Sequence, residues 1–449
     1  MKPTSTTDKT LLRLSVPMLL NSALGLVTTL LDAVIISRFS KDAAGAVSIA
    51  NQILTVAYDL SLLVGVGALV LITHALGRGD GREARDNAAL ALLANAALGA
   101  AIGVLLWFGA PALVHMLGTP ELLRADAVRY VRIIAWAMPF HAFLMAGMAC
   151  LRGFAQMRTI LLLGLVAFPA YALLSWMLVL GPGPLPALGV QGSALATLVI
   201  RVASAGVLAV VLVRSLDLQW PRLGARAAAL LRRMSALAAP SVLDNVSYGF
   251  YQLVLVSFIA GLGVTAVVSR FYTLALSAFL VVVVMAISQA NEVLVGYRVG
   301  AGRSADLRQR AWQSGAVSAL LATALGVLMW WASAPLTSLF SSDAEVHRQV
   351  RELLFLTIFI QPLTGLNTVL FHSLRVTGDV LPPVLFSQLA MWGVAAPLAW
   401  LLSVQLALGL PGLWYAFIAE ETLKTLYMAW RWSRLRIAAA LPMAAAAAP

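Results

Sequence analysis

The sequence predicts an all-α polytopic membrane protein with twelve transmembrane helices. We expect two pseudo-twofold-related six-helix bundles around a central cleft. Three observations predict this class. Of the 449 residues, 61% are hydrophobic and 11% are charged, against roughly 25% charged in soluble proteins. So much apolar surface cannot be buried inside a soluble globule. Apolar runs long enough to cross ~30 Å of hydrocarbon as helices recur along the chain, and an internal repeat divides them into two halves.

Each expected span is a continuous apolar run rich in Leu, Ala, Val and Gly. In lipid, backbone polar groups must be satisfied within the span, so runs of this length are predicted to be helices rather than barrel strands. The first run, from Leu11 to Ile36, lacks an A-x-A-type cleavage site, so we expect a retained span rather than a removed signal. The twelve runs lie near residues 12–37, 44–73, 88–110, 130–150, 159–181, 190–213, 235–260, 271–296, 312–334, 353–373, 383–405 and 412–430.

The net charge of +12 predicts membrane topology rather than a nucleic-acid partner. With the N-terminus inside, 21 of the 31 Lys and Arg residues fall in cytoplasmic segments and 8 in outer segments, while Arg201 and Lys424 fall within spans. The positive-inside rule therefore predicts that both termini are cytoplasmic. The only cysteine, Cys150, excludes an intrachain disulfide and a cysteine-based metal cluster.

Several anchors recur along the chain at a constant offset of 223 residues, which indicates two homologous halves of six spans each. Because six is even, both halves enter the membrane in the same direction, and the pseudo-twofold axis lies along the membrane normal. The matching anchors are Pro17 with Pro240; Gly77, Gly79 and Arg85 with Gly300, Gly302 and Arg308; Pro139, Leu151 and Arg152 with Pro362, Leu374 and Arg375; and Gly189 with Gly412.

The repeat predicts a two-lobed organisation suited to alternating access, in which one lobe moves against the other. The expected parts are a cytoplasmic N-terminal tail (1–10), an N-lobe with spans one to six (11–213), a basic cytoplasmic linker (214–233), a C-lobe with spans seven to twelve (234–432) and a cytoplasmic C-terminal tail (433–449).

An ordered set of short motifs, from about residue 11 to residue 435, resembles the multidrug and toxic compound extrusion (MATE) transporters. The resemblance implies a secondary antiporter that expels organic, often cationic, compounds against an inward flow of protons or sodium ions. The motifs are LSVP and LLDAVIISRFS in the first span, LGRGDGREAR after the second, CLRGFAQ after the fourth, ALGVQGSALAT at the start of the sixth, VLVGYRVGAG at the end of the eighth and SLRVTGDVLPP after the tenth.

Acidic residues within spans are candidate functional residues, because a charge in the bilayer costs several kcal/mol. Asp32 lies five residues before the outer end of the first span, roughly 8 Å deep at 1.5 Å per residue. It also stands where the MATE family carries its first-helix acid, which the resemblance assigns to ion coupling. Asp59, in the middle of the second span, is a second candidate for ion coupling, although the resemblance predicts no acid there.

Three further acids are candidates for contact with substrate in the cleft. Asp244 follows Pro240 by four residues, similar to a P-x-x-[hydrophobic]-E-N stretch in part of the family, with a helix cap or interhelical hydrogen bond as the alternative. Glu420 and Glu421 precede Lys424 by four and three residues, within reach on a helix. We expect them to pair with Lys424 and to leave one acid for the cleft.

Glu292, near the cytoplasmic end of the eighth span, is instead expected to snorkel or to pair with Arg298.

The fifth span favours proton coupling over sodium coupling. MATE relatives often carry an Asn and an Asp there, and alignment backward from Gly181 places Tyr171 and Ser175 at these positions. A sodium site with an amide and a second carboxylate would then be incomplete. We expect no cofactor and no resident metal, with H⁺ as the coupling ion and Na⁺ as the alternative. The glycine-rich GRGDG and GAG segments lack the Lys-Ser/Thr of a phosphate loop, so ATP coupling is not expected.

The sequence thus predicts a monomeric, multi-pass protein of the inner (plasma) membrane that exports amphiphilic, cationic organic compounds or drugs in exchange for protons. Two alternatives stay open. A flippase for lipid-linked oligosaccharides would need several cations in the cleft, but the spans offer only Arg201 and Lys424 against six acids. A membrane enzyme acting on lipids would need a metal or nucleophile motif, and HExxH and GxSxG are absent. A broad multidrug pump and a dedicated metabolite exporter are not distinguished.

Overall fold

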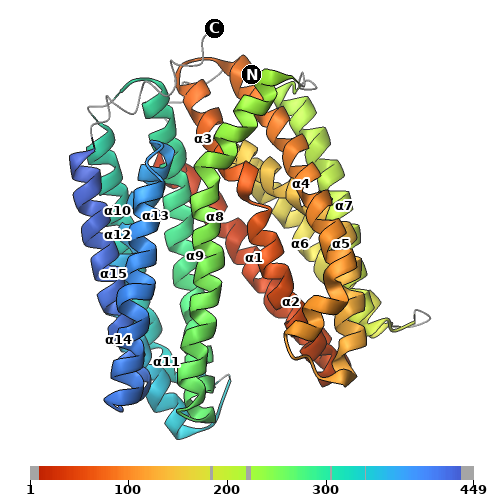
Figure 1. Ribbon diagram of the computed structural model, residues 1–449, viewed down its shortest axis with the longest axis vertical. Helices are drawn as coiled ribbons and strands as arrows, with labels where there is room; N and C mark the ends of the chain where they lie inside the picture. Colours follow the sequence, from red (N-terminus) through yellow and green to blue (C-terminus); the bar gives the residue numbers. More distant parts are fainter. Residues whose placement is uncertain (1–9, 183–185, 219–223, 304–305, 339, 436–449) are drawn as a thin grey trace. The chain divides into compact units, whose positions relative to one another are not determined.

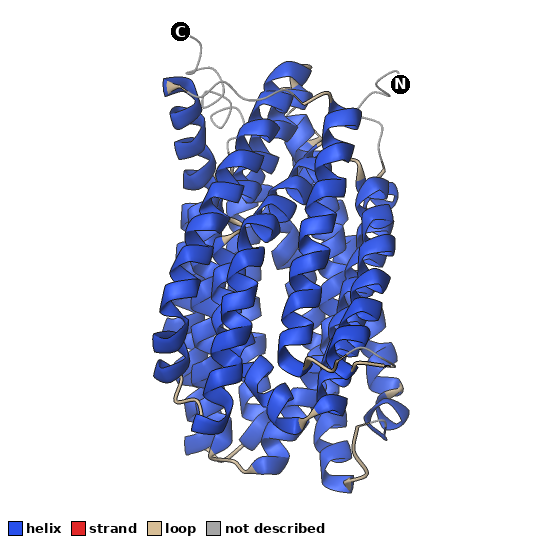
Figure 2. Ribbon diagram, turned by 90° about the vertical axis from the view of Figure 1, so that its right-hand side faces the viewer, coloured by secondary structure: helices blue, strands red, loops and turns tan. Residues whose placement is uncertain are grey.

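The computed structural model describes residues 10–182, 186–218, 224–303, 306–338 and 340–435. These residues form helices joined by short loops, and no strand occurs among them (Figure 2). The first nine residues of the expected N-terminal tail, residues 219–223 of the basic linker and the C-terminal tail from residue 436 lie outside the described residues.

Spans one to six are formed by seven helices, because the second span consists of two (Figure 1). The helices are α1 (Leu11–Phe39), α2 (Lys41–Leu60), α3 (Leu63–Gly77), α4 (Gly81–Met116), α5 (Glu121–Gly153), α6 (Met157–Leu180) and α7 (Gly189–Leu216).

Spans seven to twelve follow in the same order, and the eleventh contains two π-helical stretches. The elements are α8 (Ala225–Ala260), α9 (Val264–Gly300), α10 (Leu307–Trp331), the short α11 (Ser333–Ser338), α12 (Ala344–Val376), the eleventh span made of α13 (Leu381–Gln388), η2 (Leu389–Ala395), α14 (Ala396–Trp400) and η3 (Leu401–Gln405), and finally α15 (Gly409–Arg434).

The described helices have the length and composition of a membrane protein. Eleven spans, with Lys41–Gly77 and Leu381–Gln405 each counted as one, are long and apolar enough to cross a bilayer. The expected twelfth span is the 26-residue α15, which is more polar because it carries Glu420, Glu421 and Lys424. Large apolar side chains are exposed in mid-helix, as lipid-facing residues are: Leu105 (72%), Phe108 (77%), Val166 (73%) and Leu320 (71%).

The chain divides into two compact units. An N-terminal unit comprises Leu20–Val242, and a C-terminal unit comprises Met1–Leu19 together with Leu243–Pro449. The helices α1 and α8 each cross this division two residues after a proline, Pro17 or Pro240. The two crossing points therefore have the 223-residue spacing of the repeat.

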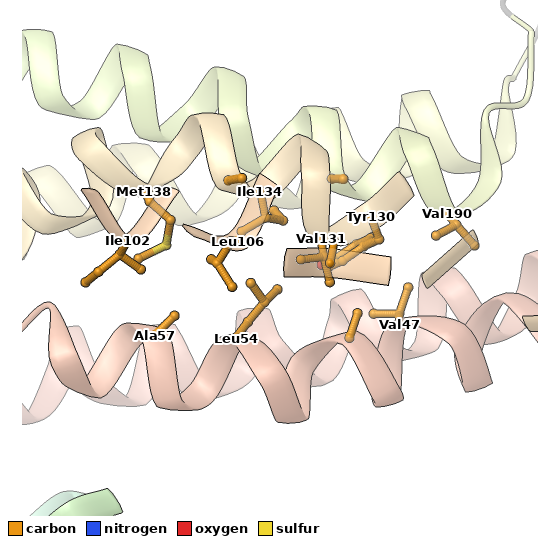
Figure 3. Packing of buried hydrophobic residues seen from close by; sticks show 14 of the residues in the cluster. Val47, Leu54, Ala57, Ile102, Leu106, Tyr130, Val131, Ile134, Met138 and Val190 are labelled. Carbon is orange, nitrogen blue, oxygen red and sulfur yellow. The ribbon is translucent and has the colours of Figure 1, made fainter. Parts of the chain in front are cut away.

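The core of the N-terminal unit lies between α2, α4 and α5 (Figure 3). Val47, Leu54 and Ala57 follow one another on α2 at intervals of seven and three residues, which places them on one helix face. They face buried side chains of the neighbouring helices, among them Ile102, Leu106, Val131, Ile134 and Met138.

Glycines allow close contact between helix pairs in each unit. A Cβ on Gly99 of α4 would overlap the backbone of α5 at Met138 and Pro139. A Cβ on Gly365 of α12 would overlap the backbone of α10 at Ala319. Small residues at such positions let transmembrane helices approach closely and gain packing contacts.

The second span is confirmed as Lys41–Gly77, but its helix is interrupted at Ser61 and Leu62 and is not continuous as predicted. The fully buried Asn95 of α4 donates hydrogen bonds to the carbonyl of Ser61 (2.7 Å) and to that of Ala142 on α5 (2.6 Å). A buried side-chain amide thereby satisfies a carbonyl at the break. Such compensation is needed because an unsatisfied backbone group in an apolar interior is costly.

The predicted pairing of Gly189 with Gly412 is wrong by three residues. Gly189 and Gly409 both begin a helix with positive φ, +52° and +62°. Gly192 and Gly412, three residues further on, both lie against the backbone at the end of the preceding span. Gly189 therefore corresponds to Gly409 and Gly192 to Gly412, because the connection before α15 is shorter than the one before α7 and an ungapped comparison misses this.

Candidate functional site

Three of the predicted site residues meet in the N-terminal unit. Asp32 lies half-buried on α1, and the hydroxyl of Ser175 on α6 donates a hydrogen bond to its carboxylate at 2.7 Å. Tyr171, one turn earlier on α6, and Ser193 on α7 interact with the same carboxylate. The structure thus brings Asp32, Tyr171 and Ser175 together, with Ser193 as a contact that the sequence did not predict.

This arrangement offers one carboxylate and several hydroxyl oxygens. A carboxyl group so placed can hold one proton and release it when a cation takes its place. Hard metal cations instead bind several oxygen ligands at once, commonly with more than one carboxylate. Among the described residues, no group of three His, Cys, Asp or Glu side chains has an arrangement that could hold a metal ion.

Asp59 is not brought to Asp32. It lies half-buried in the last turn of α2, next to the break in the second span. Within the described residues its carboxylate takes part in none of the hydrogen bonds or ion pairs. Its role in ion coupling stays a prediction.

The acids of α15 form a buried cluster in the C-terminal unit. Lys424 forms ion pairs with Glu420 and with Glu421, the second at 3.6 Å, so the expected pairing is confirmed. Tyr251 of α8 donates a hydrogen bond to Glu420 (3.0 Å). Thr364 of α12 donates one to Glu421 (3.1 Å). One lysine faces two carboxylates, so the pairing leaves a net negative charge.

Asp244 of α8 lies near this cluster and forms its own chain of hydrogen bonds with side chains of α8 and the eleventh span. Gln388 donates to the Asp244 carboxylate (2.5 Å), Ser247 donates to the Gln388 side-chain carbonyl (2.6 Å), and the indole of Trp392 donates to Ser247 (2.9 Å). Lys424 also interacts electrostatically with Asp244. The cluster therefore contains three acids and one lysine.

Sequence reasoning missed Ser247, Tyr251, Gln388 and Trp392 as partners of these acids. Ser247 and Tyr251 follow Asp244 by three and seven residues, a helical spacing that places all three on the same face. This spacing could have predicted them as neighbours of Asp244. Gln388 and Trp392 lie in the eleventh span, at the start of η2 and within it. Their polar atoms reach α8 through tertiary contact, and π-helical turns such as this one often occur at functional sites.

Glu292 is buried and pairs with a residue other than the one predicted. Its two carboxylate oxygens accept hydrogen bonds from Arg375 of α12, both at 2.9 Å. The predicted partner, Arg298, donates instead to the carbonyl of Leu294 on its own helix. The prediction was wrong because spacing along one helix does not show a partner on another.

Comparison with known proteins assigns the family. The MatE family model matches residues 17–177 and again residues 240–401. The chain belongs to the MATE family. The two matches begin 223 residues apart, which confirms the internal repeat.

Full-length relatives and solved structures agree with this assignment. The chain is 27% identical over 431 residues to the "Uncharacterized transporter YisQ" of Bacillus subtilis, covering 95% of this chain and 94% of the relative. It is 23% identical over 442 residues to the "Probable multidrug resistance protein NorM" of Thermotoga maritima, covering 95% and 93%. The fold matches a structure described as the outward-facing conformation of a multidrug resistance MATE family transporter, with a TM-score of 0.87 at 19% identity over 96% of each chain.

These findings confirm the predicted family and fold class, that of twelve helices in two bundles. This MATE-family chain is a multi-pass membrane transporter and not an enzyme. The alternative of a membrane enzyme acting on lipids is therefore overturned.

Proposed function

We propose that this MATE-family transporter is a secondary antiporter that exports amphiphilic, cationic organic compounds in exchange for protons by alternating access. The observation that carries the proposal is the Asp32 carboxylate, held within α1 and bonded to the Ser175 hydroxyl. An acid within a membrane span is expensive and commonly serves ion or proton transfer.

The surroundings of Asp32 support protons over sodium ions. Its contacts on α6 are the hydroxyls of Tyr171 and Ser175, where a sodium cage would use an amide and a second carboxylate. One carboxylate can accept a proton without any further ligand. The coupling ion is therefore proposed as H⁺.

The cluster of the C-terminal unit supports a cationic cargo. Asp244, Glu420 and Glu421 exceed the single charge of Lys424. The ring of Trp392 lies beside Tyr251, with the ring centroids 5.8 Å apart, and an aromatic face attracts organic cations. The anionic cargo of an oligosaccharide flippase would meet repulsion there.

Transport into proteoliposomes tests the coupling ion. The purified protein is reconstituted, and uptake of a fluorescent organic cation is followed under an imposed pH gradient, an imposed sodium gradient or both. We expect uptake that depends on the pH gradient, ignores the sodium gradient and stops when a protonophore is added. Uptake that follows the sodium gradient alone would overturn proton coupling.

A further inference from the structure

Arg201 is a positive charge in the interior of the N-terminal unit. It stands near the middle of the 28-residue helix α7. Its guanidinium lies over the ring of Tyr58 on α2, 4.7 Å from the centroid, and that ring contacts His141 of α5 at 4.5 Å between centroids. Arg201 therefore points into the space between α2, α5 and α7 and not toward lipid.

No acid of the described residues neutralises this charge. The ion pairs formed by those residues do not include Arg201, and its buried Nη1 lacks a hydrogen-bond partner among them. Asp59 follows Tyr58 directly in sequence but forms no ion pair with Arg201. Cations in membrane spans almost always pair with an anion or a carbonyl, because an isolated charge is costly in the bilayer. The Tyr58 ring compensates for only part of this cost.

Comparison of the two halves of the repeat shows that, among the described residues, Arg201 lacks the counter-charge present at the equivalent place in the C-terminal unit. The corrected alignment of α7 with α15 places Arg201 at the position of Glu421, and the 223-residue offset places His141 at that of Thr364. In the C-terminal unit, Glu421 accepts a hydrogen bond from Thr364 and pairs with Lys424, three residues later. Three residues after Arg201 the chain has Ser204. One half thus carries a paired acid where the other carries a cation without a counter-charge.

A second feature links Arg201 to Asp32. Ser193, Thr197 and Arg201 follow one another at four-residue intervals on α7, so they share a helix face. Ser193 interacts with Asp32, Thr197 interacts with Tyr171, and Arg201 stacks on Tyr58. Eight residues of helix correspond to about 12 Å. This face therefore has an acid near one end and a cation two turns away.

We propose that Arg201 binds a carboxylate of the exported compound, so that the preferred substrates are amphiphiles carrying both a cationic group and a carboxylate. The inference rests on the proposed export of organic amphiphiles and specifies their chemistry. A planar guanidinium presents parallel N–H groups that match a carboxylate, and one negative charge balances its own. Arg201 lies about 18 Å along α7 from the start of that helix, which places lipid headgroups out of reach in a bilayer with ~30 Å of hydrocarbon.

Two dyes that differ in one group test the inference. A rhodamine with a free benzoic acid is zwitterionic at neutral pH, and its methyl ester is a simple cation. Binding of each to the purified full-length protein is measured by fluorescence anisotropy. We expect Arg201→Gln to weaken binding of the free acid by about tenfold or more. Binding of the ester should stay within about twofold. Arg201→Lys, which keeps the charge without the planar fork, should lie between these for the free acid.

Arg132→Gln provides a control, because Arg132 lies against Trp107 on α4 and contacts neither Tyr58 nor His141. Its binding of both dyes should match wild type. Equal weakening of both dyes by Arg201→Gln, or no weakening of the acid, overturns the inference, as does a wild type that does not bind the acid. Proton-driven transport of the ester by wild type is a separate measurement, so its failure would count against the proposed function alone.

Discussion

The Asp32 carboxylate accepts a hydrogen bond from Ser175 and has the hydroxyls of Tyr171 and Ser193 nearby. Under the proposed coupling, a proton and a cation would compete for its oxygens. This competition allows the role of Asp32 in ion coupling to be tested by binding measurements. If the two ligands occupy linked sites, the effect of one on the affinity of the other must be reciprocal.

We expect substrate binding to wild type to release protons and to weaken as the pH falls. Asp32→Asn keeps the size of a protonated Asp but cannot release a proton, so binding should lose its pH dependence and export should stop. Calorimetry in buffers of different ionisation enthalpy measures the released protons. Asp42→Asn, at an exposed acid, is the control and should behave as wild type. Full pH-driven export by Asp32→Asn would show that another acid, Asp59 or Asp244, carries the proton.

The ion pair between Glu292 and Arg375 is a second feature of single residues, and its expected role is to stabilise the fold. Glu292 is 2% exposed, and removal of one partner of a buried ion pair typically costs about 3–5 kcal/mol. We expect Glu292→Gln to lower the thermal unfolding temperature in detergent markedly. Glu345→Gln, which removes an exposed pair with Arg348, should leave the unfolding temperature close to that of wild type, because exposed ion pairs are screened by solvent. Similar small losses for both variants would show that the Glu292 pair is not structurally important.

The broken second span is a feature at the scale of an element. Residues 58–64, around Ser61 and Leu62, include no proline or glycine that would mark a break, and the side chain that bonds to the carbonyl at the break, Asn95, belongs to another helix. Positions where a transmembrane helix is interrupted need polar partners from neighbouring helices.

We expect Asn95→Leu to leave the carbonyl of Ser61 without its donor and to destabilise the protein by about 1–3 kcal/mol, whereas the carbonyl of Ala142 keeps its bond within the helix α5. Thermal unfolding of the purified protein measures this loss. Asn51→Leu, at an exposed position of α2, is the matched control and should unfold near the wild-type temperature. If Asn95→Leu unfolds at the wild-type temperature, the amide does not support the break.

For the whole molecule, the distribution of basic residues predicts that both ends of the chain face the cytoplasm. A reporter that is active only in the cytoplasm, fused after Pro449, should be active. A reporter that is active only in the periplasm should be silent at the same position. The reverse result would contradict the topology. Arg201 and Lys424 do not enter this prediction, because both lie within helices of the membrane-spanning segments.

Sequence alone determined the membrane class, the places of the spans, the repeat and the family, because hydrophobicity and motif order are local properties of a chain. Ion pairing within one helix, as for Glu420 and Glu421 with Lys424, could also be predicted from the sequence. Tertiary structure decided the partner of Glu292, the link from Asp244 to Gln388 and the lack of an acid beside Arg201. These depend on contacts between residues more than eighty positions apart in sequence. No spacing within one helix specifies which neighbouring helix lies against it.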